Sequence, residues 1–317
     1  MTSFDETAAA AARARQNSLT KPPGSLGRLE ELAVFLAGWQ GRERPRLDRA
    51  QAVVFAGNHG IVAQGVNPFP AEVTALMVQN FRAGGAAINQ LCAVAGAELT
   101  VLPLRLESPT ADFTQGPAMS PEEVAEAMQA GADAVDPEAD ILLLGEMGIG
   151  NSTVAAALAA ATFDGWVEDW VGPGTGATSE VMERKVKAVA AGLARHKPAD
   201  TRATLAAFGG REQAAICGAI LRARALRIPV ILDGFICTAA AAVLTRDDPE
   251  ALAHCLIGHE SVEPGHHRLI AALGMRPVLS LDMRLGEGSG AAVALMVLKG
   301  AVACHNGMAT FAEAGIG

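Results

Sequence analysis

The sequence has no excess of positive charge. Its 25 lysine and arginine residues stand against 34 aspartate and glutamate residues, which gives a formal net charge of -9 at pH 7. Proteins that coat a phosphate backbone rely on clustered lysine and arginine. This balance therefore argues against nucleic acid as a partner.

Long apolar runs are also missing. Half of the residues are hydrophobic, but they fall in short, Ala-rich runs, and none reaches the roughly 20 apolar residues that cross a bilayer. The N-terminus is acidic and then Ala-rich, whereas a secretory signal has a basic segment followed by an apolar core. We therefore expect no membrane span and a cytoplasmic location.

Cysteine is sparse, and its pattern excludes a simple metal site. The five cysteines are an odd number, are widely scattered and show no close Cys/His spacing typical of zinc. Cys255 beside His254 and Cys304 beside His305 are the nearest approaches, and adjacent side chains on one element point apart. We expect ordinary thiols and no metal.

Several short apolar runs, most of them followed by Gly or Asp, alternate with Ala-rich stretches. They cover residues 52–56, 98–102, 140–144, 229–232 and 277–281. The alternation indicates β-α units around a parallel sheet. The runs lack strict apolar/polar alternation, which is typical of strands that helices cover on both faces. We predict a three-layer α/β/α fold with a mostly parallel, doubly wound sheet.

Both ends of the chain have the pattern of helices. We predict that residues 1–40 and 292–317 pack together as a small helical subdomain, and that residues 41–291 form the large α/β catalytic domain.

Glycine-rich loops recur where parallel sheets bind ligands, beyond the strands' carboxyl ends. Loop 145–150 leads into an Ala-rich helix, with Asn151 or Ser152 as its expected N-cap. It is either an ordinary turn or an anion site made of backbone amides. Its glycines do not have the dinucleotide spacing Gly-x-Gly-x-x-Gly, and no Gly-Lys-Ser/Thr follows.

Three charged side chains stand near such loops. Lys185 follows the glycine loop 172–176, and either neutralises a phosphate or belongs to a solvated helix face. Glu287 lies between two glycines after the last predicted strand, and is either a general base or a solvated loop carboxylate. His59 either binds substrate or transfers a proton, or is an ordinary loop histidine.

Longer motifs identify a family. They are the segments 21–30 (KPPGSLGRLE), 57–89 with its end NFRAGGAAIN, 145–151 (GEMGIGN), 232–235 (LDGF) and 283–291 (MRLGEGSGA). In this order, and nearly end to end, the sequence resembles the nicotinate-nucleotide:dimethylbenzimidazole phosphoribosyltransferases, which make the lower-ligand nucleotide of cobalamin.

The resemblance implies transfer of ribose 5-phosphate from nicotinate mononucleotide to 5,6-dimethylbenzimidazole, without a cofactor or metal, by a homodimer. It implies Glu287 as the catalytic base. It places Glu146, Met147 and Gly148 at the ribose-phosphate site, with Gly174, Lys185 and Ser261 near the phosphate. Asn67, Leu76 and Leu285 are expected beside the accepting base.

The base site departs from many relatives. They carry Ser where this chain has Asn67 and Gln where it has Leu76, and some carry Asp at Asn58. Leu76 in place of an amide is expected to favour an apolar, methylated ring. Because the sequence has no tyrosine and few aromatic residues, we expect aliphatic side chains, with Phe69 or Phe81, to sandwich the flat base.

Two other function classes are the alternatives. A nucleotide-binding oxidoreductase needs a dinucleotide fingerprint with an acidic residue about 20 positions on, and the sequence shows neither convincingly. A non-catalytic nucleotide-binding regulator would tolerate loss of Glu287.

Overall fold

The computed structural model describes residues 2–174 and 176–316. At its centre lies a five-stranded, wholly parallel sheet in the order β2-β1-β3-β4-β5. The strand order reverses direction along the chain, as in doubly wound folds. The strands are β1 (Ala50–Ala56), β2 (Ala97–Pro103), β3 (Ile141–Met147), β4 (Val230–Leu232) and β5 (Cys255–Ile257).

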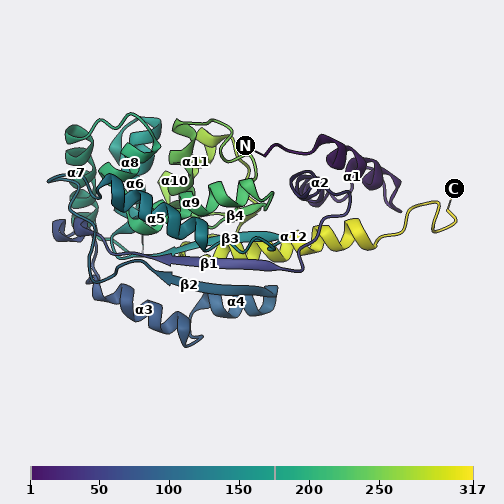
Figure 1. Cartoon of the computed structure of the whole chain (residues 1–317), viewed down its shortest axis with the longest axis horizontal. Helices are drawn as coiled ribbons and strands as arrows, with labels where there is room; N and C mark the ends of the chain where they lie inside the picture. The colour runs from purple at the N-terminus through teal and green to yellow at the C-terminus, as the bar shows by residue number, and fades with distance from the viewer. Residues whose placement is uncertain (1, 175, 317) are drawn as a thin grey trace.

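Helices cover both faces of the sheet, which lies between them in Figure 1. The predicted α/β/α fold is therefore confirmed. One layer contains α5 (Pro121–Asp133), α6 (Asn151–Phe163), α7 (Ser179–Arg195), α8 (Thr201–Phe208), α9 (Arg211–Ala225), α10 (Phe235–Ala242) and α11 (Pro264–Leu273). The other contains α3 (Glu72–Arg82), α4 (Ala87–Ala95) and α12 (Ser289–Gly307). Short 3-10 turns η1 (Gly60–Gln64), η2 (Val167–Asp169) and η3 (Val243–Arg246) lie between these elements.

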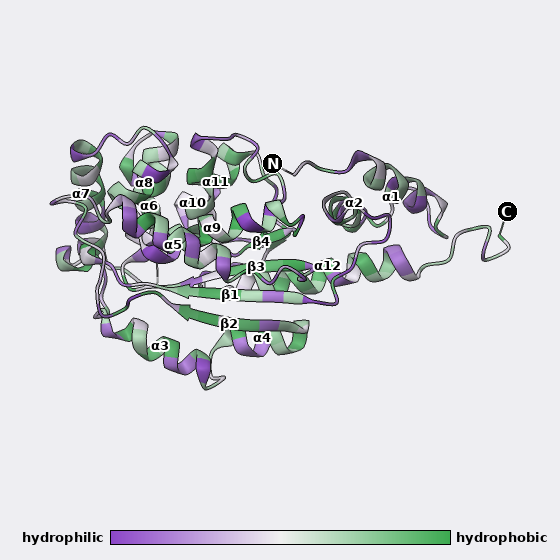
Figure 2. Cartoon of the chain, in the orientation of Figure 1, coloured by the Kyte–Doolittle hydropathy of each residue, from purple (hydrophilic) through white to green (hydrophobic). Residues whose placement is uncertain are grey.

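Alternate residues of each strand enter two separate cores. Leu142 and Leu144 of β3 face the α5–α10 layer, while Ile141 and Leu143 face α4 and α12. All four side chains are almost completely buried. This explains why the central strands β1 and β3 are apolar at most positions, since a strand covered on both faces has no solvent side, whereas the edge strand β2 is partly exposed. The strands in Figure 2 are accordingly mostly green.

Helix α12 is both long and apolar. By length and composition alone it could cross a membrane, yet half of its most apolar window is buried inside the fold. Leu295 and Leu298 lie in the core beneath the sheet. A core helix gives the same sequence signal as a membrane span, and the packing of α12 is that of a core helix.

One strand prediction was wrong, and one strand of the main sheet was not predicted. The run 277–281 forms only a two-residue strand, β7 (Leu279–Ser280), which pairs with β6 (His259–Glu260) outside the main sheet. The fifth strand of the main sheet is instead β5, which the sequence did not predict.

The N-terminal helices lie beside the C-terminal part of α12 (Figure 1). The N-terminal helices are α1 (Glu6–Ser18) and α2 (Arg28–Gln40). Arg15 of α1 donates to the carbonyl oxygens of His305, Asn306 and Met308. These contacts join the first helix to the end of α12. The division into a helical subdomain of residues 1–40 and 292–317 stays a prediction, because α12 starts at Ser289 and runs continuously from the sheet to these helices.

Candidate active site

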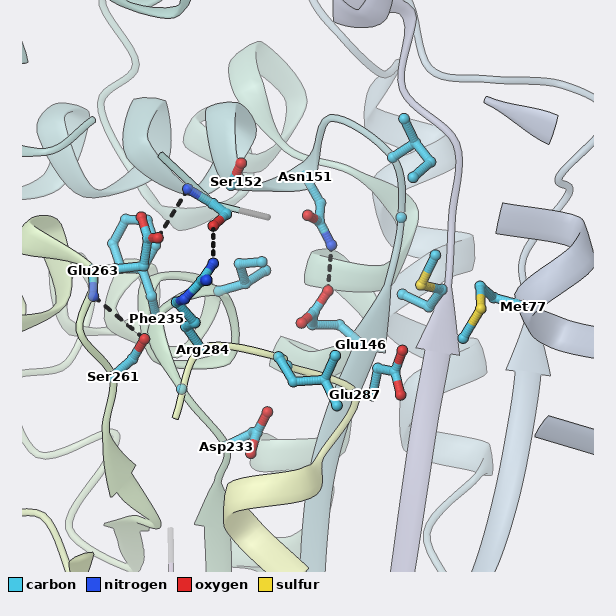
Figure 3. A pocket seen from close by; sticks show the side chains of 18 of the residues that line it. Met77, Glu146, Asn151, Ser152, Asp233, Phe235, Ser261, Glu263, Arg284 and Glu287 are labelled. Carbon is cyan, nitrogen blue, oxygen red and sulfur yellow. Dashed lines mark hydrogen bonds between the residues drawn. The ribbon is translucent and has the colours of Figure 1, made fainter. Parts of the chain in front are cut away.

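A cavity of about 230 Å³ lies beyond the carboxyl ends of β3 and β4. This is where an open parallel sheet binds its ligand. The chain reaches it from seven places: the segment before and within α3, the end of β3, the start of α6, the loop before α7, the end of β4, β6 with the segment after it, and the loop before α12. Figure 3 shows the side chains that point into it.

Most of the predicted site residues line this cavity. They are Asn67, Glu146, Met147, Gly148, Gly174, Ser261, Leu285 and Glu287. Motifs far apart in the sequence therefore meet at one place.

Leu76 does not line the cavity. Its side chain is 60% exposed, because α3 turns Val73 and Met77, not Leu76, toward the cavity. Leu76 is therefore outside the wall of this cavity, and its contact with the base stays a prediction.

Glu287 is held in an unusual backbone conformation. Gly286, Glu287 and Gly288 all have positive φ, at 82°, 64° and 83°. For Glu287 this left-handed conformation costs about 1 kcal/mol, and such strain clusters at functional sites. Gly145 of β3 packs so closely that a Cβ there would lie 2.6 Å from the nitrogen of Gly288. The two flanking glycines and Gly145 thus bring the loop onto the end of β3.

The surroundings of Glu287 are those of a buried acid. Only 8% of the residue is exposed, so the alternative of a solvated loop carboxylate is excluded. Burial, and then the neighbouring charge of Asp233, raise the pKa of Glu287 to about 7. A general base works best when its pKa is near the working pH. Glu287 therefore has the environment of a proton acceptor at neutral pH.

Asp233, at the end of β4, anchors this loop. The backbone amides of Gly288 and Ala291 donate to its two carboxylate oxygens, at 3.1 and 2.9 Å. Asp233 is 1% exposed, and its Oδ1 lies 3.7 Å from Nε2 of His259. Asp233 therefore both fixes the start of α12 and adds negative charge beside Glu287.

We predict that Asp233→Asn shifts the acidic limb of the pH–rate profile to lower pH. Removing the neighbouring charge lowers the pKa of Glu287 from its raised value, so Glu287 becomes a base in more acidic solution. The limb is measured as log kcat/KM against pH. Asp282→Asn, at an exposed position, is the control and should leave the limb unmoved. An acidic limb that moves to higher pH in Asp233→Asn would contradict the proposed effect of the Asp233 charge on the pKa of Glu287.

Glu146 lies beside Glu287 at the end of β3 (Figure 3). Burial, and then the charges of Asp233, Glu212 and Glu287, raise its pKa well above the usual value. Nδ2 of Asn151 donates to its Oε2. Because a positive charge nearby would favour the ionised form of Glu146, this carboxyl is suited to a cationic ligand.

The N-cap of α6 differs from the prediction. Asn151 is the first residue of the helix, and the N-cap is Gly150, whose left-handed backbone has a φ of 91°. The side chain of Asn151 is therefore free to bond to Glu146, and that of Ser152 to line the cavity.

Lys185 is almost completely buried, so the solvated-face alternative is excluded. Its ammonium group donates to Oγ of Ser152 at 3.0 Å and to the carbonyl oxygen of Gly172 at 2.6 Å. Ser152 and Gly174 line the cavity directly. Burial lowers the pKa of Lys185 to about 8. A positive charge is therefore held just behind one end of the cavity wall.

His59 does not line the cavity. It is buried, with Nε2 at 2.8 Å from Oε1 of Glu212. A Cβ on Gly148 would lie 2.9 Å from the same nitrogen. His59 therefore supports the loop after β3 from behind.

Several cavity residues were not predicted as site residues. They are Asn151, Ser152, Asp233, Phe235, His259 and Glu263. The first four lie in or next to the glycine-marked loops at strand ends, so a signal existed. His259 and Glu263 follow strands too short to be recognised in the sequence.

Among residues 2–174 and 176–316, no group of three or more His, Cys, Asp or Glu side chains is arranged to hold a metal ion. The cavity's acidic groups are spread over separate loops.

The chain is an enzyme of the phosphoribosyltransferase class, because a family with that description matches residues 1–316. A relative from Rhodobacter capsulatus, named nicotinate-nucleotide–dimethylbenzimidazole phosphoribosyltransferase, is 61% identical over 98% of this chain and 93% of its own length. A relative of the same name from Roseobacter denitrificans is 61% identical over 96% and 91%.

Solved structures agree. The crystal structure of CobT from Thermus thermophilus has a TM-score of 0.93 and 44% sequence identity, and covers 98% of this chain and 99% of its own. The chain belongs to the nicotinate-nucleotide–dimethylbenzimidazole phosphoribosyltransferase family. These findings do not favour the oxidoreductase or the non-catalytic regulator.

Proposed function

We propose that this chain transfers ribose 5-phosphate from nicotinate mononucleotide to 5,6-dimethylbenzimidazole, giving α-ribazole 5'-phosphate and nicotinate. Relatives named for this reaction are similar in sequence to this chain over nearly their whole length. The observation that carries the proposal is Glu287, a buried carboxylate with a pKa near 7 in the cavity at the sheet edge.

Glu287 accepts the proton in this mechanism. The acceptor nitrogen attacks C1 of the ribose while the bond from C1 to nicotinate breaks. The electrons of that bond return to the pyridine nitrogen and discharge its positive charge. The acceptor's N–H proton passes to Glu287, which contributes about 10²- to 10⁴-fold as a positioned base. Holding donor and acceptor in one cavity adds the gain from orientation.

Glu146 faces the positive charge of the donor. The pyridinium ring and the sugar in the transition state both carry positive charge, which an ionised carboxylate nearby stabilises. Three neighbouring carboxylates contribute to the raised pKa of Glu146 in the free site. The positive charge of the bound donor would offset their negative charge and favour the ionised form of Glu146. Met147 and Gly148, next along the chain, line the same part of the cavity.

The phosphate is proposed to bind at the end of the cavity near Lys185, Gly174 and Ser261. A buried ammonium group lies there behind Ser152, and Gly174 and Ser261 form part of the wall. Backbone amides and a nearby cation are the usual ligands of a phosphate group.

The experiment measures release of nicotinate from its mononucleotide with and without dimethylbenzimidazole, and identifies the nucleotide formed. We expect release that depends on the base, with an α-linked product. Hydrolysis that is equally fast without the base would contradict the proposed transfer.

The acceptor is predicted to be an apolar, methylated ring. Phe69, Val73, Met77 and Leu285 give the cavity an apolar wall, with Asn67 beside them. We expect dimethylbenzimidazole to be preferred over hydroxybenzimidazole by about tenfold or more, the usual value of methyl groups in an apolar pocket. Competition for limiting enzyme measures the ratio of kcat/KM values.

Met77→Gln should reduce this preference, because it places an amide in the wall. Glu72→Gln is the matched control on the same helix, because Glu72 is exposed and does not line the cavity, and it should leave the ratio unchanged. Preference of the unmodified enzyme for the hydroxylated base would contradict the prediction.

The proposal includes a homodimer in the cytoplasm. Leu76 on α3 and Val94 on α4 are large, exposed apolar residues, as expected of a face that a second copy covers. Light scattering after size exclusion would give the mass of the assembly, and fractionation of cells would test the location.

A further inference from the structure

Glu263 is a carboxylate that the proposed mechanism does not use. It precedes α11, is 6% exposed and lines the cavity. The backbone amide of Gly174 donates to its Oε1 at 2.9 Å. Its Oε2 has no hydrogen-bond partner among the described residues. The side chain therefore lies at the phosphate end of the cavity, and one of its two oxygens has no hydrogen-bond donor among the described residues (Figure 3).

The loop that contains Gly174 is shaped around this carboxylate. A Cβ on Gly172 would lie 1.9 Å from Oε2 of Glu263. Glycine is needed there because any side chain would enter the space of the carboxylate. The group is thus inserted against the backbone of the loop and is not a solvated surface acid.

Lys185 is near Glu263 without bonding to it. The ammonium group bonds to two neutral oxygens, those of Ser152 and Gly172. No ion pair within 4.0 Å joins it to Glu263 among the described residues. The charge of Lys185 nevertheless favours the ionised form of Glu263. The arrangement matches an anion site in which one amide is already taken by a carboxylate.

We propose that Glu263 holds, in the free enzyme, the place of a phosphate oxygen of the nucleotide, and that the phosphate binds by displacing this carboxylate from the amide of Gly174. The proposal rests on the proposed function, which assigns the phosphate to this end of the cavity. An amide that donates to a carboxylate has the geometry to donate to a phosphate oxygen, because both are anionic oxygen acceptors.

The exchange has a charge consequence. Lys185 on α7 and Arg284 on the loop before Glu287 are the cations near Glu263, and His266 on α11 accepts from the amide of Ser261. An ionised Glu263 opposes an arriving phosphate, whereas a protonated Glu263 does not. Burial raises the pKa of Glu263, against the effect of Lys185. Phosphate affinity should therefore fall as pH rises through the pKa of Glu263.

The test uses inorganic phosphate as a competitor of nicotinate mononucleotide, with the full-length chain. Glu263→Gln removes the charge and keeps the shape, and should tighten phosphate binding about tenfold at alkaline pH, the effect of removing one adjacent like charge. At acid pH the two proteins should differ less. Glu260→Gln, a partly exposed carboxylate on β6, is the matched control and should bind phosphate like the unmodified enzyme.

A second variant separates displacement from a scaffolding role. Glu263→Asp retracts the carboxylate from the amide of Gly174, and should also tighten phosphate binding. If Glu263 instead holds the loop in the shape that binds phosphate, both variants should bind phosphate no more tightly than the unmodified enzyme does. That result would overturn the inference while leaving the reaction intact.

Lys185→Met distinguishes failure of the assigned site from failure of the inference. If inorganic phosphate does not compete with the nucleotide, and Lys185→Met leaves the KM for the nucleotide unchanged, the phosphate does not bind here. The assigned phosphate site and the role of Glu263 would then fall together.

Discussion

Glu287→Gln should lower kcat by about 10²- to 10⁴-fold, the usual contribution of a positioned general base. Glutamine has the shape of glutamate and keeps the loop's volume, but it cannot accept the proton of the acceptor base. The unmodified enzyme should lose activity as pH falls below about 7, because Glu287 becomes protonated near that value. This acidic limb should be absent from the residual activity of the variant.

Glu287→Asp provides the matched comparison. It keeps a carboxylate but withdraws it by one methylene, so turnover should lie between that of the unmodified enzyme and the Gln variant. Steady-state turnover and the melting temperature of each variant separate a chemical effect from a folding defect. Near-normal turnover by a folded Gln variant would remove Glu287 from proton transfer.

Lys185→Met should raise the KM for nicotinate mononucleotide about 10- to 100-fold, the value of a charged hydrogen bond to a partly buried anion. Methionine fills much of the same space without the charge. The KM of the unmodified enzyme should also rise above about pH 8, where the buried ammonium loses its proton. The variant should not show this alkaline rise.

Lys187→Met is the control for helix α7. Lys187 lies two positions along on the exposed face of the helix, so its loss removes the same charge from the protein without touching the cavity. Its KM for the nucleotide should stay within about twofold, as for a surface charge. An equal rise of KM in both variants would mean that net charge, and not the buried ammonium, governs binding.

The strands that the sequence predicts well are the ones whose apolar runs are long. β1, β2 and β3 each have seven residues, enough to stand out between helices. β4 and β5 have only three residues each, too few for any period to be seen, and β4 is predicted because Pro229 and Asp233 mark the ends of its run. The run at 277–281 resembles a strand of the main sheet, but its pairing depends on contacts, such as that from Val278 to Ile257, which no local pattern contains.

The site shows the same limit. The motif around Glu287 identifies it by resemblance, but the residues alone leave a solvated carboxylate open as the alternative. What decides between them is the burial of Glu287 and the bond from Gly288 to Asp233, a residue 55 positions earlier. The bond between Gly174 and Glu263 spans 89 positions. Electrostatic environment arises from such distant pairs, so it becomes visible only once the chain is folded.

The path of α12 has a consequence for the order in which the protein can mature. All strands of the main sheet precede this helix in the sequence, so a growing chain completes the sheet before it has made the helix that covers one face. Until residues 289–307 are available, Leu143 and Ile231 lack the partners that they have in that core.

Exposed apolar strands of this kind are prone to aggregation. The same helix begins two residues after Glu287. When α12 packs on the sheet, it therefore also brings the carboxylate of Glu287 to its place at the end of β3. A nascent chain without α12 therefore exposes the apolar face of its strands and has no positioned Glu287. Formation of α12 removes the risk of aggregation and completes the active site in one step.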